Sequence, residues 1–67
     1  MSAIKTLREK SGLTQQILSE KIGVDRSTVA KWEAGVSFPN AAKLPIIADV
    51  LGCQISDLFD NGDTENK

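Results

Sequence analysis

Histidine and tyrosine are both absent from this 67-residue chain, and there is one cysteine. Without histidine, the chain lacks the side chain that most often serves as a general base or a metal ligand near neutral pH. Cys53 alone can form neither a disulfide within the chain nor a thiolate metal site, and it has no imidazole partner for nucleophilic catalysis. No glycine-rich phosphate loop follows a convincing strand. These absences predict a protein that is not an enzyme, binds no metal and carries no cofactor.

Long apolar runs are also missing. No run approaches the roughly 20 residues of a membrane span, and the N-terminus lacks the apolar core of a signal peptide. A chain of 67 residues forms one small domain and buries only about 60% of its unfolded surface. Its core is therefore small, and the sequence predicts no pocket for a small molecule. We therefore expect a cytoplasmic protein with neither a membrane partner nor a small-molecule ligand.

The net charge of −1 does not by itself favour a nucleic-acid ligand, but the charges are unevenly distributed. Residues 1–34 hold six basic and four acidic side chains, whereas residues 35–67 hold two basic and five acidic ones. Such a dipolar distribution would orient the N-terminal half toward phosphate. Residues 60–67, DNGDTENK, have no apolar face, and we predict that they form a flexible acidic tail outside a domain of residues 1–59.

Residues 13–33, LTQQILSEKIGVDRSTVAKWE, predict two short helices joined by a tight turn. The hydroxyl of Thr14 can cap the first helix, on which Leu18 and Ile22 lie four residues apart on one face. Gly23 can then adopt the positive φ that a tight turn requires. The pattern is helix, turn, helix.

The second of these helices, residues 26–33, has an apolar side and a polar side. Asp25 offers its N-cap, and at about 100° per residue Val29 and Trp32 share the buried side. A helix this short is not stable alone and must pack its apolar side against the domain. That packing leaves its polar side available to a binding partner. That other side, with its flank, carries Arg26, Ser27, Ala30 and Lys31.

Six residues of this segment match a known pattern in type and spacing: Gln15, Ser19, Gly23, Val24, Val29 and Trp32. They resemble the helix-turn-helix of the Cro/Xre-type (phage repressor-like) DNA-binding family, and the likeness extends from about Ile4 to Phe59. The resemblance implies an all-α fold, a compact five-helix lambda-repressor-like domain whose second and third helices form the helix-turn-helix.

The resemblance also pairs Arg8, on a first helix marked by Ile4 and Leu7, with Glu33 at the end of the third helix. A bidentate guanidinium–carboxylate link would tie these two helices together. The alternative is two solvated surface charges that contribute little.

What the resemblance implies about function is a sequence-specific DNA-binding transcriptional regulator, most simply a repressor, of bacterial or phage origin. Its recognition helix, residues 26–33, would lie in the major groove of double-stranded operator DNA. A guanidinium can contact guanine O6 and N7 together, so Arg26 leads a predicted base-reading set of Arg26, Ser27 and Lys31. The predicted DNA-backbone contacts are Gln15, Gln16, Thr28 and Lys43. A merely solvated charged face is the alternative for Arg26 and Lys31.

The loop VSFP, residues 36–39, departs from the family pattern, which often has Lys or Arg here. Val36 and Phe38 predict either fewer phosphate contacts or contact with the core or a second subunit. One such module touches only a few base pairs, so we expect a homodimer on a site of two-fold symmetry. The candidate interface residues are Phe38, Ile46, Val50, Ile55 and Phe59.

The remainder predicts two more helices. Asn40 can cap a fourth helix whose inward face includes Leu44 and Leu51, and Pro45 must lie near its first turn. A last turn would close the core through its apolar residues, which are Ile55, Leu58 and Phe59.

Two other functions fit the same fold. An antitoxin would bind both DNA and a toxin, and Ile17, if exposed, could belong to such a partner surface. A protein-interaction domain could retain the fold after losing DNA binding, because a fold alone does not establish function.

Overall fold

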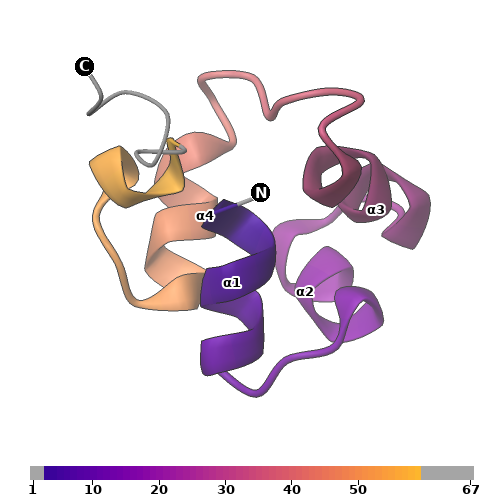
Figure 1. The fold of residues 1–67 in the computed structure, drawn as a ribbon, viewed down its shortest axis with the longest axis horizontal. Helices are drawn as coiled ribbons and strands as arrows, with labels where there is room; N and C mark the ends of the chain where they lie inside the picture. Colours follow the sequence, from indigo (N-terminus) through magenta and orange to yellow (C-terminus); the bar gives the residue numbers. More distant parts are fainter. Residues whose placement is uncertain (1–2, 60–67) are drawn as a thin grey trace.

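The computed structural model describes residues 3–59, which form four α-helices and a single 3₁₀ turn (Figure 1). Within these residues there is no strand, which confirms the all-α class. The predicted acidic tail, residues 60–67, lies outside the described residues. The elements are α1 (Ala3–Lys10), α2 (Gln15–Ile22), α3 (Arg26–Ala34), α4 (Leu44–Leu51) and η1 (Ile55–Leu58).

Helices α2 and α3 lie on one side of the domain and α4 and η1 on the other (Figure 1), while α1 contacts both α3 and η1, and α2 packs directly against α4. Each element contributes at least one buried apolar side chain, because a single helix cannot cover its own apolar face and must pack it against other elements. The helices of residues 3–59 all fall short of the length and apolar character that crossing a membrane requires. The core consists of Ile4, Leu18, Ile22, Val29, Trp32, Ile47, Ala48, Leu51 and Leu58.

The turn chemistry around α2 is as the sequence predicts. The Thr14 hydroxyl accepts a hydrogen bond from the backbone N–H of Ile17 at 3.1 Å, which makes Thr14 the N-cap. Gly23 ends the helix with φ +88°, a conformation that a side chain would strain. Asp25 occupies the N-cap position of α3, but its side chain makes no capping hydrogen bond.

The start of the fourth helix differs from the prediction. The Asn40 side chain accepts a hydrogen bond from the backbone N–H of Lys43 at 3.2 Å, so it caps a separate turn ahead of the helix. Helix α4 itself begins at Leu44, with Lys43 in the N-cap position and Pro45 in the first turn, where a missing N–H has no cost.

The prediction of five helices is wrong in its last member, since η1 is only one 3₁₀ turn of four residues. Gln54 and Asp57 close that turn with a capping box, and Phe59 already has extended backbone dihedrals, so residues 3–59 contain no fifth α-helix. Of the three residues expected to close the core, only Leu58 is buried, at 2% exposure. Ile55 and Phe59 are 41% and 45% exposed.

One ion pair links the two ends of the helix-turn-helix unit to α1. The Arg8 guanidinium donates from Nε to one Glu33 carboxylate oxygen at 2.6 Å and from Nη2 to the other at 3.1 Å. Its Nη1 donates to the carbonyl of Leu13 at 2.7 Å, just ahead of α2. The side chains are only 11% and 4% exposed, so this is the bidentate link expected and not a pair of solvated charges.

The environment of Glu33 favours its charged form. Burial alone would raise the pKa of this carboxyl, but hydrogen bonds from Arg8 and Gln15, together with attraction by Arg8 and Lys5, outweigh burial and lower the pKa. The folded protein therefore holds the carboxylate more tightly charged than the unfolded chain does.

We predict that Glu33→Gln lowers the free energy of unfolding by about 3 kcal/mol at pH 7, because it leaves a nearly buried guanidinium without its counter-charge. Urea unfolding followed by Trp32 fluorescence measures this. Glu9→Gln is the matched control, since Glu9 lies 3.9 Å from the same arginine but is 58% exposed. That variant should cost less than about 1 kcal/mol, and equal losses in the two variants would contradict the assignment.

The same pair predicts an acid-dependent stability. Because the pKa of Glu33 is lower in the folded state, its contribution is fully present above the unfolded carboxyl pKa of about 4.3 and is lost as the pH falls through the folded value. Unfolding measured over a pH series should show wild type losing more stability than Glu33→Gln below about pH 5. Parallel curves for the two proteins would exclude this contribution.

Candidate nucleic-acid interface

Helix α3 presents its polar side to solvent. Val29 and Trp32 anchor the opposite side, at 0% and 7% exposure, and this confirms the predicted division of the helix. Arg26, Ser27 and Lys31 are all exposed. The three residues predicted to read bases are therefore accessible and lie on one continuous side of a helix at the edge of the molecule (Figure 1).

Helix α2 supports α3 from behind. The two helices pack directly against each other (Figure 1), and Ser19 lies at 1% exposure among the core residues of α2. Its hydroxyl donates to the carbonyl of Gln16 at 2.7 Å, so this buried polar group is satisfied within its own helix. A small side chain here allows the helices to approach closely, which holds the outer side of α3 at a fixed angle.

Gln15, at the start of α2, is bonded to α3 at two points. Its Nε2 donates to a Glu33 carboxylate oxygen at 3.0 Å, and its Oε1 accepts from Nη1 of Arg26 at 3.5 Å. The contacts predicted from the sequence place Gln15 and Arg26 independently on DNA and do not include this connection between them. The available signal was that Arg26 and Glu33 lie seven residues apart, which places them on the same flank of a helix.

The other predicted backbone contacts are dispersed. Gln16 is exposed, and its amide donates to Glu20 at 2.8 Å on the same helix. Thr28 and Lys43 are half-buried, the latter at the N-terminus of α4 and not in the helix-turn-helix. Their contacts with DNA remain predictions.

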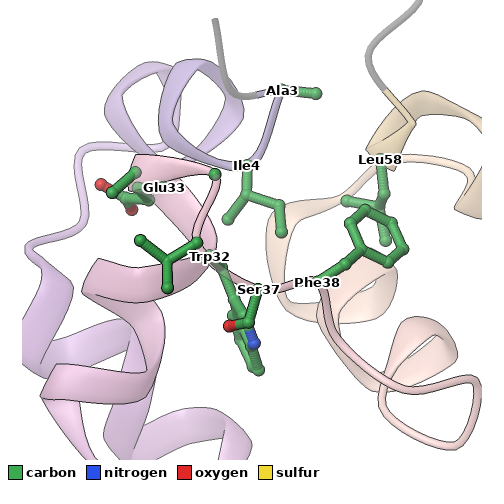
Figure 2. A pocket seen from close by; sticks show the side chains of 10 residues that line it. Ala3, Ile4, Trp32, Glu33, Ser37, Phe38 and Leu58 are labelled. Carbon is green, nitrogen blue, oxygen red and sulfur yellow. The ribbon is translucent and has the colours of Figure 1, made fainter.

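Apolar side chains collect on another face, where the loop after α3 meets the C-terminal turn. Phe38 and Phe59 stack with ring centroids 5.3 Å apart, yet they remain 50% and 45% exposed. Beside them a groove of about 680 Å³ runs between the start of α1, the end of α3 and η1. Figure 2 shows Ile4, Trp32, Phe38 and Leu58 around this groove. Val36, also in its lining, is 72% exposed.

The remaining interface candidates differ in accessibility. Ile46 and Ile55 are each 41% exposed, whereas Val50 is half-buried and packs against the core. Ile17 is exposed at 41%, but single exposed apolar residues are ordinary and do not by themselves define a partner surface.

Cys53 is half-buried beside the core. Burial, and secondarily the nearby carboxylate of Asp57, raise the pKa of its thiol. The thiol is therefore mainly protonated near neutral pH, and this is the form in which cysteine is a poor nucleophile.

Comparison with known proteins finds helix-turn-helix relatives. A sequence profile of a helix-turn-helix family matches residues 4–58. The HTH-type transcriptional activator BcrR of Enterococcus faecalis is 31% identical over 96% of this chain, and an uncharacterized HTH-type transcriptional regulator of Archaeoglobus fulgidus is 39% identical over 92%. The chain spans 34% of the length of the first protein and 89% of the second.

A solved structure of a repressor has the same fold as this chain. The P22 c2 repressor, in complex with a synthetic operator, superimposes with a TM-score of 0.80 over 85% of this chain and 86% of its own, at 26% identity. The helical arrangement, the helix-turn-helix and the matched profile lead to one conclusion: this chain belongs to the Cro/Xre-type helix-turn-helix family of DNA-binding transcriptional regulators.

Proposed function

We propose that this protein is a sequence-specific repressor that inserts α3 into the major groove of operator DNA. The observation that carries the proposal is the accessible polar side of α3, backed by buried Val29 and Trp32 and braced by α2. The P22 c2 repressor, which is similar in fold, is bound to an operator. Repression is the simpler mode, because occupying an operator requires no surface beyond the DNA-binding one.

Base reading is assigned to Arg26, Ser27 and Lys31. Arg26 stands at the N-terminus of α3, and its guanidinium can donate to both O6 and N7 of a guanine. Lys31, one and a half turns further along, can contact a second guanine or a phosphate. The hydroxyl of Ser27 suits a base edge or a phosphate, so its contribution to specificity is smaller.

Backbone contacts are assigned to Gln15, Gln16, Thr28 and Lys43. The start of α2 provides amide donors and the positive end of a helix dipole, which together suit a phosphate. Basic residues outnumber acidic ones by two in residues 1–34, so this half of the chain would face the DNA.

A homodimer would supply the second half-site. The exposed stack of Phe38 and Phe59 and the exposed Val36 of the same loop form an apolar surface, and Ile55 is a further exposed apolar residue of η1. Two copies joined there would cover this surface and could place their recognition helices about 34 Å apart on one face of the duplex. Ile46 could extend the interface, whereas Val50 has less side chain available for it.

We predict that Arg26→Ala weakens binding to the selected operator by about 1–3 kcal/mol and relaxes preference at one base pair. Selection of bound DNA from a random pool identifies the operator, and mobility-shift titration against single-base variants measures the effect. Lys10→Ala is the control, because it removes the same charge from an exposed position on α1. If wild type shows no sequence preference, the chain is instead an interaction domain that retains the fold.

We further predict that Phe38→Ser shifts the protein toward monomer and weakens operator binding, because it removes half of the exposed aromatic stack. Sedimentation equilibrium over a concentration series, with and without operator DNA, measures the change. Ile17→Ser, an exposed apolar residue on α2, is the control and should leave association unchanged. A wild-type protein that is monomeric both free and on DNA would exclude the dimer.

A further inference from the structure

The hydrogen bonds around Gln15 connect a nearly buried carboxylate to the predicted base reader. We infer that Glu33 is a positioning residue for specificity, acting through the side-chain amide of Gln15 on the guanidinium of Arg26. This inference rests on the proposed function, since it concerns how Arg26 is held before it meets DNA.

The charge of Glu33 determines which way the Gln15 amide faces. A carboxylate can only accept hydrogen bonds, so the amide must turn its NH₂ group toward Glu33, at 3.0 Å. Its carbonyl oxygen is thereby turned away, toward Nη1 of Arg26 at 3.5 Å. With the opposite orientation, the amide NH₂ group would face the Arg26 guanidinium, donor against donor. The amide oxygen would face the Glu33 carboxylate, acceptor against acceptor.

Helical geometry makes a single amide sufficient for both contacts. Arg26 and Glu33 are seven residues apart, or about two turns, so their side chains leave α3 along the same flank. Gln15 reaches this flank from the start of α2. The chain Glu33–Gln15–Arg26, here called the relay, therefore runs along α3 from its C-terminal end to its N-terminal end.

Holding Arg26 in this way matters because the side chain is exposed and has many rotamers. A long side chain that must be ordered on binding loses conformational entropy at that step, and preorganisation reduces the loss. Glu33 itself is 4% exposed and cannot touch DNA, so any influence on base preference must pass through other residues. Arg8 holds the carboxylate in place, which fixes the inner end of the relay.

The test is a mutant cycle read as discrimination, defined as the Kd for the site altered at the base pair read by Arg26 divided by the Kd for the selected site. Glu33→Gln allows the Gln15 amide to face either way, and Gln15→Met removes the amide while leaving the Arg8–Glu33 pair intact. We expect each to lower discrimination about three- to ten-fold, the range for one hydrogen bond. In an Arg26→Ala background, neither should change it further.

Two controls separate the relay from simpler effects. Leu18→Val destabilises the core without touching the relay, so discrimination should remain at the wild-type level. Gln16→Met alters the neighbouring glutamine, which is bonded only within α2, and it should weaken binding to all sites alike. A residue that serves only as a phosphate contact would behave like Gln16, whereas Gln15 should also change discrimination.

The outcomes divide cleanly. If Arg26→Ala abolishes discrimination but Glu33→Gln and Gln15→Met retain it, the relay is excluded and the proposed function stands. If the two variants lower discrimination equally in the presence and absence of Arg26, the relay is also excluded. If Arg26→Ala has no effect on discrimination, the base-reading role and the relay fail together. Should Glu33→Gln not fold, Gln15→Met decides the result alone.

Discussion

The ion pair between Arg8 and Glu33 joins the first and third helices at a place where little water reaches either charge. Three donors of one guanidinium are used there, two on the carboxylate and one on the carbonyl of Leu13. A single arginine thus positions both the entry to α2 and the end of α3. In a domain with so small an apolar core, such a contact determines how α3 is oriented as well as how stably it packs.

Helix α3 is nine residues long, and six of its residues divide into three sides. Val29 and Trp32 face the core, Ser27 and Lys31 face solvent, and the flank between them holds Arg26 and Glu33. A substitution on the flank therefore affects both the packing of α3 and its contacts with α1 and α2. Glu33, with a side chain only 4% exposed, is connected through Gln15 to the exposed Arg26.

Phe38 and Phe59 form an apolar face that also connects two parts of the chain. Stacking the two rings joins the loop after α3 to the end of η1 without burying either ring fully. The same loop also exposes Val36, so residues 36–39 present an apolar surface and no basic side chain. Association through that surface would recover, by doubling the DNA contacts, the affinity that a weakly charged monomer lacks.

By itself, the sequence determined the class of fold, the turn at Gly23, the sides of α3 and the family, because these depend on local periodicity, capping and residue spacing. The sequence pattern predicted a fifth helix where the structure has the 3₁₀ turn η1, and it placed Asn40 at the cap of the fourth helix and not at the turn before it. One 3₁₀ turn and one α-helical turn share the same short pattern, so the sequence alone does not distinguish them. Only the tertiary structure decided that Gln15 bridges Glu33 and Arg26 and that Phe38 stacks on Phe59. Those contacts join residues from separate elements, and their geometry depends on how the helices pack.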